Sequence, residues 1–415
     1  MKNLNAIISI LIIISFISWS CKDDDDPDKI IEISPGPNAE QEIQEAFITV
    51  ENFGWTILLK AGEYPITGTL SMDGKFNTKI RGEGPDKTIL SFENQSDGGD
   101  GLLITNSGNI TISDLRIEDT VGDALKVRNT AGVIVDNVST VWNGDVSPEN
   151  GGYGIYPVLC SNVIVRNSMA SGASDAGIYV GQSLGALVHN NTVHENVAGI
   201  EIENTIDADV YNNHAQNNTA GILVFDLPGL TQSGENIRVF DNTVIDNNHD
   251  NFAPPGGIVR EVPPGTGILV LATKNVEVFN NTVTNNEIVG VAAFSFISIA
   301  TVIGQEIPED FNPFFDQVYI FDNQISRENS PNPNQTAIGL LLVNQFGAVP
   351  MPMPDLLTDG IFSPEAGENG GLCIKNNGTE YFVNLHMGSQ SSDPSVDLGP
   401  HDCTFLPLPG VTIPG

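Results

Sequence analysis

Six polar and aromatic side chains could act together, because they recur at matching places in successive repeats of the chain. Each lies in a short segment where apolar residues alternate with other residues, and this alternation directs the other residues away from the apolar side. The six are Lys126, Arg128, Tyr156, Tyr179, Glu201 and Glu203. Two cations, two aromatic rings and two carboxylates on one solvent-facing surface make the best candidate site in the sequence.

Two reactions suit this set. In a lyase, a base removes the proton beside a uronate carboxylate while a cation stabilises the anion that develops. Lys126 or Arg128 would neutralise the anion that develops, and a tyrosine would transfer the proton. Glu201 with Glu203 would hold Ca²⁺ through oxygen ligands. In a glycosidase, the two glutamates would act as acid and base, with Cα atoms roughly 7 Å apart along one strand.

The same surface also suits binding without catalysis, since tyrosine rings can stack on sugar rings. The neighbouring insertion, residues 143–152, adds Asp145, Glu149 and Asn150. Because a fold does not determine a function, we take polysaccharide binding as the primary interpretation and leave the question of enzyme activity open. The alternatives are a polysaccharide lyase or other glycan-active enzyme on uronate-containing polymers, and an adhesion or structural protein without catalysis.

The elements that must position these residues are short strands in a repeat. Gly177, Gly199 and Gly221 are each 22 residues apart, and each opens a segment of alternating apolar residues. A fixed period of this length with period-two alternation is typical of a stacked solenoid built from strands. We therefore predict an all-β fold, a parallel β-helix, whose coils continue up to Gly339.

A second column of residues supports the repeat. Asparagines follow aligned strand segments at the same point of five coils, namely Asn191, Asn213, Asn242, Asn281 and Asn323. Asparagine tolerates left-handed backbone at a turn and can both donate and accept hydrogen bonds. We expect these side chains to form a ladder along the axis of the solenoid, with a structural role.

The ends and insertions follow from the same pattern. Residues 39–50 have apolar side chains at helical spacing, so a short helix is expected to cap the N-terminal end of the solenoid. Loops rich in Pro, Gly and Asn are expected to protrude over residues 143–152, 227–235, 249–264 and 297–317.

The opening of the solenoid resembles a known group of proteins. The segments IQEAF, ILLKAGEY, IRGEG and KTIL, which begin at residues 43, 57, 80 and 87, are similar to the start of right-handed parallel β-helix proteins of the pectin-lyase-like superfamily. The resemblance implies the right-handed fold over residues 39–343. That superfamily includes lyases, hydrolases, epimerases, adhesins and carbohydrate-binding repeats. The chain lacks the Gly-His-Gly and Asn-Thr-Asp motifs of polygalacturonases and the Tyr-Gly-x-Asp-Pro-His motif of mannuronan epimerases.

The N-terminus has the layout of an export signal. An apolar run over residues 7–17 is too short to span a bilayer, and Ser20-Cys21 after it resembles a bacterial lipobox. The following KDDDD resembles the surface-export tag of Bacteroidota lipoproteins. These resemblances imply a lipid on Cys21 and a cell-surface protein anchored in the outer membrane.

We therefore expect four parts in the chain. They are a lipoprotein signal peptide over 1–20, an acidic tether over 21–37, the capped β-helix over 38–343, and a C-terminal cap and tail over 344–415. Cys373 and Cys403 lie in the last part and are expected to form a disulfide in an exported chain. Cys160 is expected to be a buried apolar residue.

The charge of the chain limits its partners. The formal net charge is −35 and the pI is about 4.1, which argues against a nucleic-acid partner because phosphate binding needs clustered Lys and Arg. A polyanionic glycan could still bind if a cation such as Ca²⁺ bridges the charges. We expect a monomer whose partners are a polysaccharide and, through its lipid, a membrane.

Overall fold

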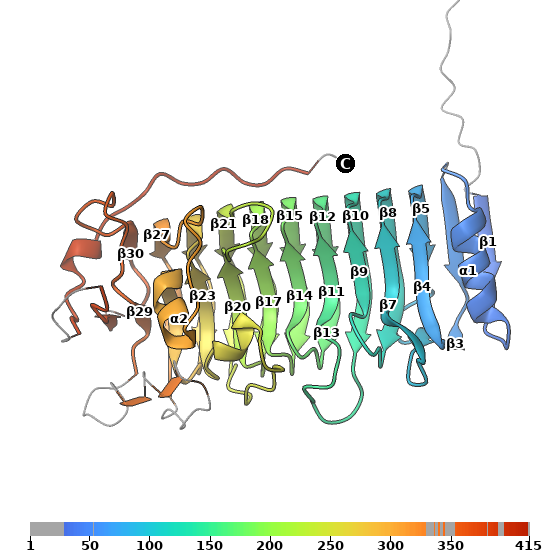
Figure 1. Cartoon of the computed structure of the whole chain (residues 1–415), viewed down its shortest axis with the longest axis horizontal. Coiled ribbons are helices and arrows are strands. Elements are labelled where there is room, and N and C mark those ends of the chain that lie inside the picture. The colour runs from blue at the N-terminus through green and yellow to red at the C-terminus, as the bar shows by residue number, and fades with distance from the viewer. Residues whose placement is uncertain are drawn as a thin grey trace, which may run out of the picture.

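The computed structural model shows an elongated parallel β-helix whose coils stack along one axis (Figure 1). It describes residues 29–52, 54–328, 336, 339–340, 343–344, 353–379, 381–388 and 394–413. The expected signal peptide, Cys21 and the tether up to residue 28 lie outside these residues. Within the described part of the chain, no helix is both long and apolar enough to cross a membrane.

Each coil contributes parallel strands to three faces. The first face consists of β4 (Gly68–Asp73), β7 (Asp97–Thr105), β9 (Leu125–Arg128), β11 (Tyr153–Val158), β14 (Ala176–Gly181), β17 (Ala198–Glu203), β20 (Ala220–Phe225), β23 (Thr266–Leu271), β26 (Val289–Phe294), β29 (Leu356–Thr358) and β31 (Phe382–Asn384).

The second face consists of β1 (Lys29–Ile33), β2 (Trp55–Leu59), β5 (Phe76–Arg81), β8 (Gly108–Glu118), β10 (Ala131–Val141), β12 (Ser161–Arg166), β15 (Leu184–His189), β18 (Ile206–Tyr211), β21 (Glu235–Phe240), β24 (Lys274–Phe279), β27 (Asp316–Phe321) and β30 (Leu372–Lys375). The third face consists of β3 (Gly62–Pro65), β6 (Thr88–Ser91), β13 (Met169–Ser171), β16 (Thr192–His194), β19 (His214–Gln216), β22 (Thr243–Ile245), β25 (Thr282–Thr284) and β28 (Gln324–Ser326). The long strands β8 and β10 belong to both of these faces.

The alternation seen in the sequence explains the core. Ile178, Ile200 and Ile222 pair in register on β14, β17 and β20, and all three are fully buried inside the solenoid. Burial of each such side chain contributes about 1.5–3 kcal/mol. The repeat of 22 residues is therefore one coil, as the sequence predicts.

The predicted asparagine ladder is present. In each step the Nδ2 group of one asparagine donates to the Oδ1 atom of the next, at 2.8–3.0 Å, from Asn191 through Asn213, Asn242, Asn281 and Asn323. The ladder extends one coil further, to Asn377. A second ladder, which the sequence analysis missed, joins Asn196, Asn218, Asn247 and Asn286 with steps of 2.9–3.0 Å.

The N-terminal end is capped by a helix, α1 (Ala39–Thr49), whose buried residues include Ile43 and Phe47. This confirms the helix expected over residues 39–50. The tether boundary at residue 37 is wrong, because residues 29–33 form β1 and pair with β2. This strand carries alternating isoleucines that the surrounding acidic composition obscures, and Ile33 is buried.

The boundary at residue 343 is also wrong. Strands β29, β30 and β31 continue the first and second faces, so coils extend to Asn384. Gly339 and Leu340, expected to open a coil, are helical. Long insertions separate these last strands and hide the repeat. Cys373 and Cys403 form the expected disulfide, with an S–S distance of 2.08 Å, and the Cys160 thiol is buried as expected.

The C-terminal segment after η3 (Gly399–His401) runs back along the outside of the second face (Figure 1). The backbone N–H of Leu408 donates to Glu277 Oε1 at 3.0 Å, and that of Val411 donates to Asp209 Oδ2 at 3.1 Å. Both carboxylates are buried beneath this segment. The expected tail is therefore part of the packed structure through residue 413.

Two insertions that were expected to protrude instead cover part of the first face. The 3₁₀ helix η1 (Ile258–Glu261) lies within the insertion 249–264, and helix α2 (Phe296–Ile303) begins one residue before the insertion 297–317 and continues into it. Val259, Phe296 and Ile299 are buried against outward side chains of β20, β23 and β26. The expectation rested on the Pro and Gly content of these loops. It fails because their apolar residues pack against the first face.

Candidate functional site

The candidate site lies on the outward side of β9, β11, β14 and β17, at the middle of the first face. Lys126 on β9 pairs with Tyr156 on β11, and Tyr179 on β14 pairs with Glu201 on β17. Arg128 is exposed at the end of β9. The predicted residues thus share one face of neighbouring strands, as the sequence analysis expected.

Three tyrosine rings pack together at this point. The ring centroids of Tyr153 and Tyr156 are 4.3 Å apart, and those of Tyr156 and Tyr179 are 4.9 Å apart with an interplanar angle of 84°. Tyr153 also contacts Tyr179 at 4.8 Å. The Lys126 ammonium lies 5.0 Å from the Tyr156 ring centroid, in cation–π contact. Tyr153 was missed because it pairs with Ala176, in a column occupied by small residues in the next coils.

Tyr179 and Glu203 are joined by a short hydrogen bond. The Tyr179 hydroxyl on β14 donates to Glu203 Oε1 on the adjacent strand β17, at 2.6 Å. Gly181 makes this geometry possible, because a Cβ atom at that position would lie 2.2 Å from both the hydroxyl oxygen and Cε1 of Tyr179. The tyrosine ring therefore occupies the space that a side chain at residue 181 would fill.

Glu201 is not on a solvated surface, which corrects the expectation from strand alternation. Its exposed fraction is 3%, the same as that of Tyr179, because neighbouring side chains of the cluster cover both. Burial and the nearby Asp175 and Glu203 carboxylates raise the pKa of Glu201 well above its usual range. A hydrogen bond with Glu203 favours a proton on Glu201, and Glu201 Oε2 has no hydrogen-bond partner among the described residues.

Asp175 is a further carboxylate of the site that the sequence analysis missed. The Tyr153 hydroxyl donates to Asp175 Oδ2 at 3.1 Å, while Asp175 Oδ1 has no hydrogen-bond partner in the described structure. Burial raises the pKa of Asp175 to about 7. The residue precedes β14 in a turn, where strand alternation cannot predict a direction. We name Tyr153, Tyr156, Asp175, Tyr179, Glu201 and Glu203 the tyrosine–carboxylate cluster.

Lys126 is held beside the cluster by aspartates. Its Nζ atom lies 2.8 Å from Asp123 Oδ2 and 3.8 Å from Asp100 Oδ1. Asp123 is largely desolvated, and this burial raises its pKa although Lys126 opposes the shift. The charge of Lys126 is therefore balanced by Asp100 and Asp123, and its ammonium group also faces Tyr156. This makes Lys126 less available to a ligand than the sequence suggested.

The environment of the two glutamates does not fit the predicted calcium ion. Ca²⁺ is bound by several ionised or neutral oxygen ligands, whereas Glu201 is buried with a raised pKa and shares a hydrogen bond with Glu203. Among the described residues, no group of three or more His, Cys, Asp or Glu side chains could hold a metal ion. Calcium binding stays a prediction from the sequence, and we derive no step through it.

The raised carboxyl pKa values lead to a prediction about pH. The folded protein keeps the proton of Asp175 up to about pH 7, whereas the unfolded chain releases it near its ordinary pKa of 3.8. Folding stability from this group is therefore present at low pH and is lost as the pH rises from about 4 to about 7. Over this pH range, we expect the free energy of unfolding of Asp175→Asn to fall by a few kcal/mol less than that of wild type. Urea titrations at several pH values measure this, and parallel profiles for the two proteins would contradict it.

An open groove of about 720 Å³ lies elsewhere on the solenoid, where the first face turns into the second. Its lining includes Phe76, Asn129, Ala131, Gln182 and Leu184. Phe76 and Leu184 are exposed at 43% and 51%, respectively. The hydrogen bonds of its amides are made within the protein, as when Gln182 accepts from Thr231. The groove is a second surface that a ligand test must distinguish from the cluster.

Comparisons with known proteins agree with this fold. Residues 100–259, which include all six residues of the cluster, match the family model for the right handed beta helix region. No curated protein sequence matches the chain. With its three-faced parallel coils, the chain has the right-handed parallel β-helix fold.

Solved structures share the fold at low sequence identity. A mutant DFA-IIIase from Arthrobacter chlorophenolicus A6 is 11% identical, with a TM-score of 0.50, over 80% of this chain and 92% of that chain. The A-module of the mannuronan C-5 epimerase AlgE4 from Azotobacter vinelandii is 15% identical, with a TM-score of 0.46, over 83% and 91% of the two chains. The polygalacturonase from Erwinia carotovora is 10% identical, with a TM-score of 0.41, over 74% and 96%. The likeness to the DFA-IIIase concerns the fold alone, and we draw no conclusion from the two structures with lower TM-scores.

Proposed function

We propose that this chain binds a polysaccharide across β9, β11, β14 and β17, with the tyrosine–carboxylate cluster at the centre of the binding surface. The observation that carries the proposal is the pair of buried carboxyl oxygens without partners, Asp175 Oδ1 and Glu201 Oε2, within a group of three tyrosines. A buried acceptor or donor left unpaired costs about 1–3 kcal/mol. Both oxygens have almost no exposed area, so a sugar hydroxyl would reach them and offset that cost after the neighbouring tyrosine rings move aside.

The shape and charge of the surface support this proposal. Four neighbouring strands spaced by ~4.8 Å span roughly 14 Å, which is the length of a short oligosaccharide. Tyr153, Tyr156 and Glu203 are partly exposed and surround the more deeply buried Glu201 and Tyr179. Aromatic rings beside carboxyl groups suit a sugar, which has apolar faces and many hydroxyl groups.

Cleavage of the bound glycan is the second candidate function, and the raised carboxyl pKa values favour it. A carboxyl group that keeps its proton near neutral pH can act as a general acid on a glycosidic oxygen. Burial also raises the pKa of Tyr179 strongly, which disfavours a tyrosinate base for a lyase reaction. Because Glu201 and Glu203 contact each other, they would act as one proton-sharing pair and not as two groups flanking the bond at 5 Å or more.

Variants of two half-buried tyrosines test the binding surface. We expect Tyr156→Ala to weaken polysaccharide binding about tenfold, because it removes a ring that would pack on the sugar and that faces Lys126. Tyr211→Ala is the matched control, since Tyr211 stacks between His189 and Phe240 on the second face. Calorimetric titration with pectate, alginate and neutral glycans, with and without Ca²⁺, gives the affinities. Equal affinities of wild type and Tyr156→Ala would contradict the proposal.

The same glycans separate binding from catalysis. New reducing ends indicate hydrolysis, and ultraviolet absorbance of an unsaturated product indicates a lyase. Products that disappear in Glu203→Gln would identify an enzyme acting at the cluster. Binding without any product across the panel favours a binding or adhesion module.

We further propose that the protein is held at the cell surface by a lipid on Cys21, as the resemblance of its N-terminus to lipoprotein signals implies. A single acyl chain gives only marginal membrane attachment, so stable anchoring needs more than one. We expect Cys21→Ser to move the protein from the membrane fraction to the soluble fraction after expression with its own signal. Unchanged partitioning would show that the anchor is elsewhere.

A further inference from the structure

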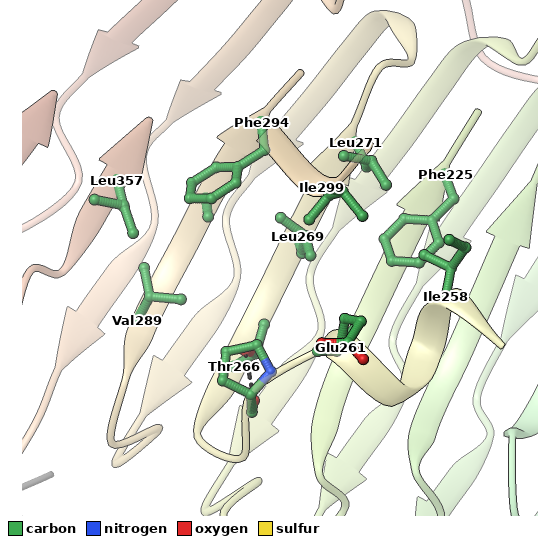
Figure 2. A pocket seen from close by; sticks show the side chains of 13 residues that line it. Phe225, Ile258, Glu261, Thr266, Leu269, Leu271, Val289, Phe294, Ile299 and Leu357 are labelled. Atoms are coloured by element: carbon green, nitrogen blue, oxygen red, sulfur yellow. Dashed lines mark hydrogen bonds between the residues drawn. The ribbon is translucent and has the colours of Figure 1, made fainter. Parts of the chain in front are cut away.

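The first face is covered immediately beyond the tyrosine–carboxylate cluster. Glu203 on β17 pairs with Phe225 on β20, which pairs with Leu271 on β23. Phe225 and Leu271 are buried, and Ile258 of η1 and Ile299 of α2 lie over this part of the face (Figure 2). A glycan at the cluster therefore lies over β9, β11, β14 and β17, and it meets the charges of the coils that contain these strands.

Carboxyl groups outnumber cations in these coils. The strands of the surface carry two cations, Lys126 and Arg128, both on β9. Strands β11 and β14 have no charged residue, and β17 has two glutamates. The preceding strand β7 and the turns before β9 and β14 add one aspartate each. The five carboxyl groups are Asp100, Asp123, Asp175, Glu201 and Glu203.

Lys126 is already neutralised within the protein. Its Nζ atom lies 2.8 Å from Asp123 Oδ2 and 3.8 Å from Asp100 Oδ1. The same ammonium group faces the Tyr156 ring. This leaves Arg128, which is exposed at the end of β9, as the cation of these strands that an acidic ligand could reach. A polyuronate carries a carboxylate on each sugar unit, so one arginine does not balance its charge.

The charges that act on Tyr156 are mainly negative. Burial raises the pKa of the Tyr156 hydroxyl, and the carboxylates of Asp123 and Glu203 raise it further. Asp175 acts in the same direction, whereas Arg128 opposes the rise. Like charges across a binding surface reject a partner even where other contacts are favourable. An anionic group would therefore be repelled at the ring that is expected to pack on the sugar.

We propose that the cluster selects against anionic glycans, so that its ligand is a neutral polysaccharide and not a uronate or sulfate polymer. The proposal rests on the proposed function, since it concerns the ligand of that same surface. Hydroxyl groups of a neutral sugar can donate to a carboxylate and can accept from a protonated carboxyl group. A carboxylate of an acidic chain would instead lie among like charges.

The test compares polymers that share a backbone and differ in charge. The pairs are polygalacturonate and its methyl ester, carboxymethyl cellulose and hydroxyethyl cellulose, and alginate and its carboxyl-reduced form. A chelator is present so that no divalent cation bridges the charges. In the pair that wild type binds best, we expect the neutral member to bind at least about tenfold more tightly at low ionic strength. Added salt should reduce this ratio, because salt screens repulsion between charges but does not relieve a steric misfit.

Asp123→Asn tests the role of local charge, because it removes the nearer carboxylate from Lys126 and keeps the shape of the side chain. We expect the ratio of neutral to acidic affinity to fall about tenfold. Asp100→Asn should lower the ratio as well, which guards against a folding defect in the first variant. Asp241→Asn is the matched control, since Asp241 is exposed on a turn with left-handed backbone that asparagine also adopts. It should keep the wild-type ratio.

The outcomes separate this proposal from the proposed function. Equal or tighter binding of the acidic member by wild type would overturn the charge selectivity and leave glycan binding at the cluster intact. A ratio that stays constant with added salt and in both aspartate variants would also overturn it, because the preference would then be steric. Failure of wild type to bind any member of the three pairs would overturn both proposals.

Discussion

Asn213→Leu is expected to lower the free energy of unfolding by about 3–5 kcal/mol, because several buried polar groups would lose their partners at once. Asn213 Oδ1 accepts hydrogen bonds from both the backbone N and the Nδ2 group of Asn191, each at 3.0 Å. Asn213 Nδ2 donates to the Val188 carbonyl at 2.9 Å and to Asn242 Oδ1 at 3.0 Å. Leucine has a similar size but can make none of these bonds.

Chemical denaturation monitored by circular dichroism gives the required free energies. Gln216→Leu is the matched control, because Gln216 lies in the same coil but is exposed on the third face. We expect the control to change stability by less than about 0.5 kcal/mol. If Asn213→Leu unfolds with the same free energy as wild type, the ladder contributes nothing to stability and this part of the account is wrong.

Gly181→Ala is expected to weaken glycan binding at least tenfold, although it removes no polar atom. The new Cβ atom would lie 2.2 Å from the Tyr179 ring, so the ring must move and its 2.6 Å hydrogen bond to Glu203 must break. Overpacking of this kind also costs about 1–3 kcal/mol of stability. The loss of binding follows because Tyr179 and Glu203 form the centre of the proposed surface.

Calorimetric titration of the folded variant with the glycan that wild type binds best measures this effect. Gly99→Ala is a suitable control, since a Cβ atom at residue 99 has no atom within 4 Å. The control should bind like wild type. Retention of full affinity by Gly181→Ala would mean that the position of the Tyr179 ring does not matter for the ligand.

The sequence carried most of the information on the fold because a solenoid repeats the same local rule in each coil. Gly177, Gly199 and Gly221 mark coils that the structure contains, and Asn191 to Asn323 form the expected ladder. The rule weakens where insertions interrupt it, which is why the coils containing β29 to β31 were not recognised. It also weakens where a strand lies in a strongly charged segment, as with residues 29–33.

The candidate site was predictable only in part. Alternation along strands places Tyr156, Tyr179 and Glu203 on the outward side, but it does not reveal what covers that side. Burial of Glu201 depends on neighbours from other coils, and the covering of later coils depends on apolar residues within irregular insertions. Asp175 lies in a turn, so its direction depends on backbone geometry that a strand pattern does not encode.

The most direct test of the central claim is a crystal structure of the protein soaked or co-crystallised with the oligosaccharide that it binds best. We expect the sugar to lie across β11, β14 and β17, in contact with Tyr156 and within hydrogen-bond distance of the partly exposed Glu203. Sugar found in the open groove between Phe76 and Leu184, with nothing at the cluster, would contradict the account.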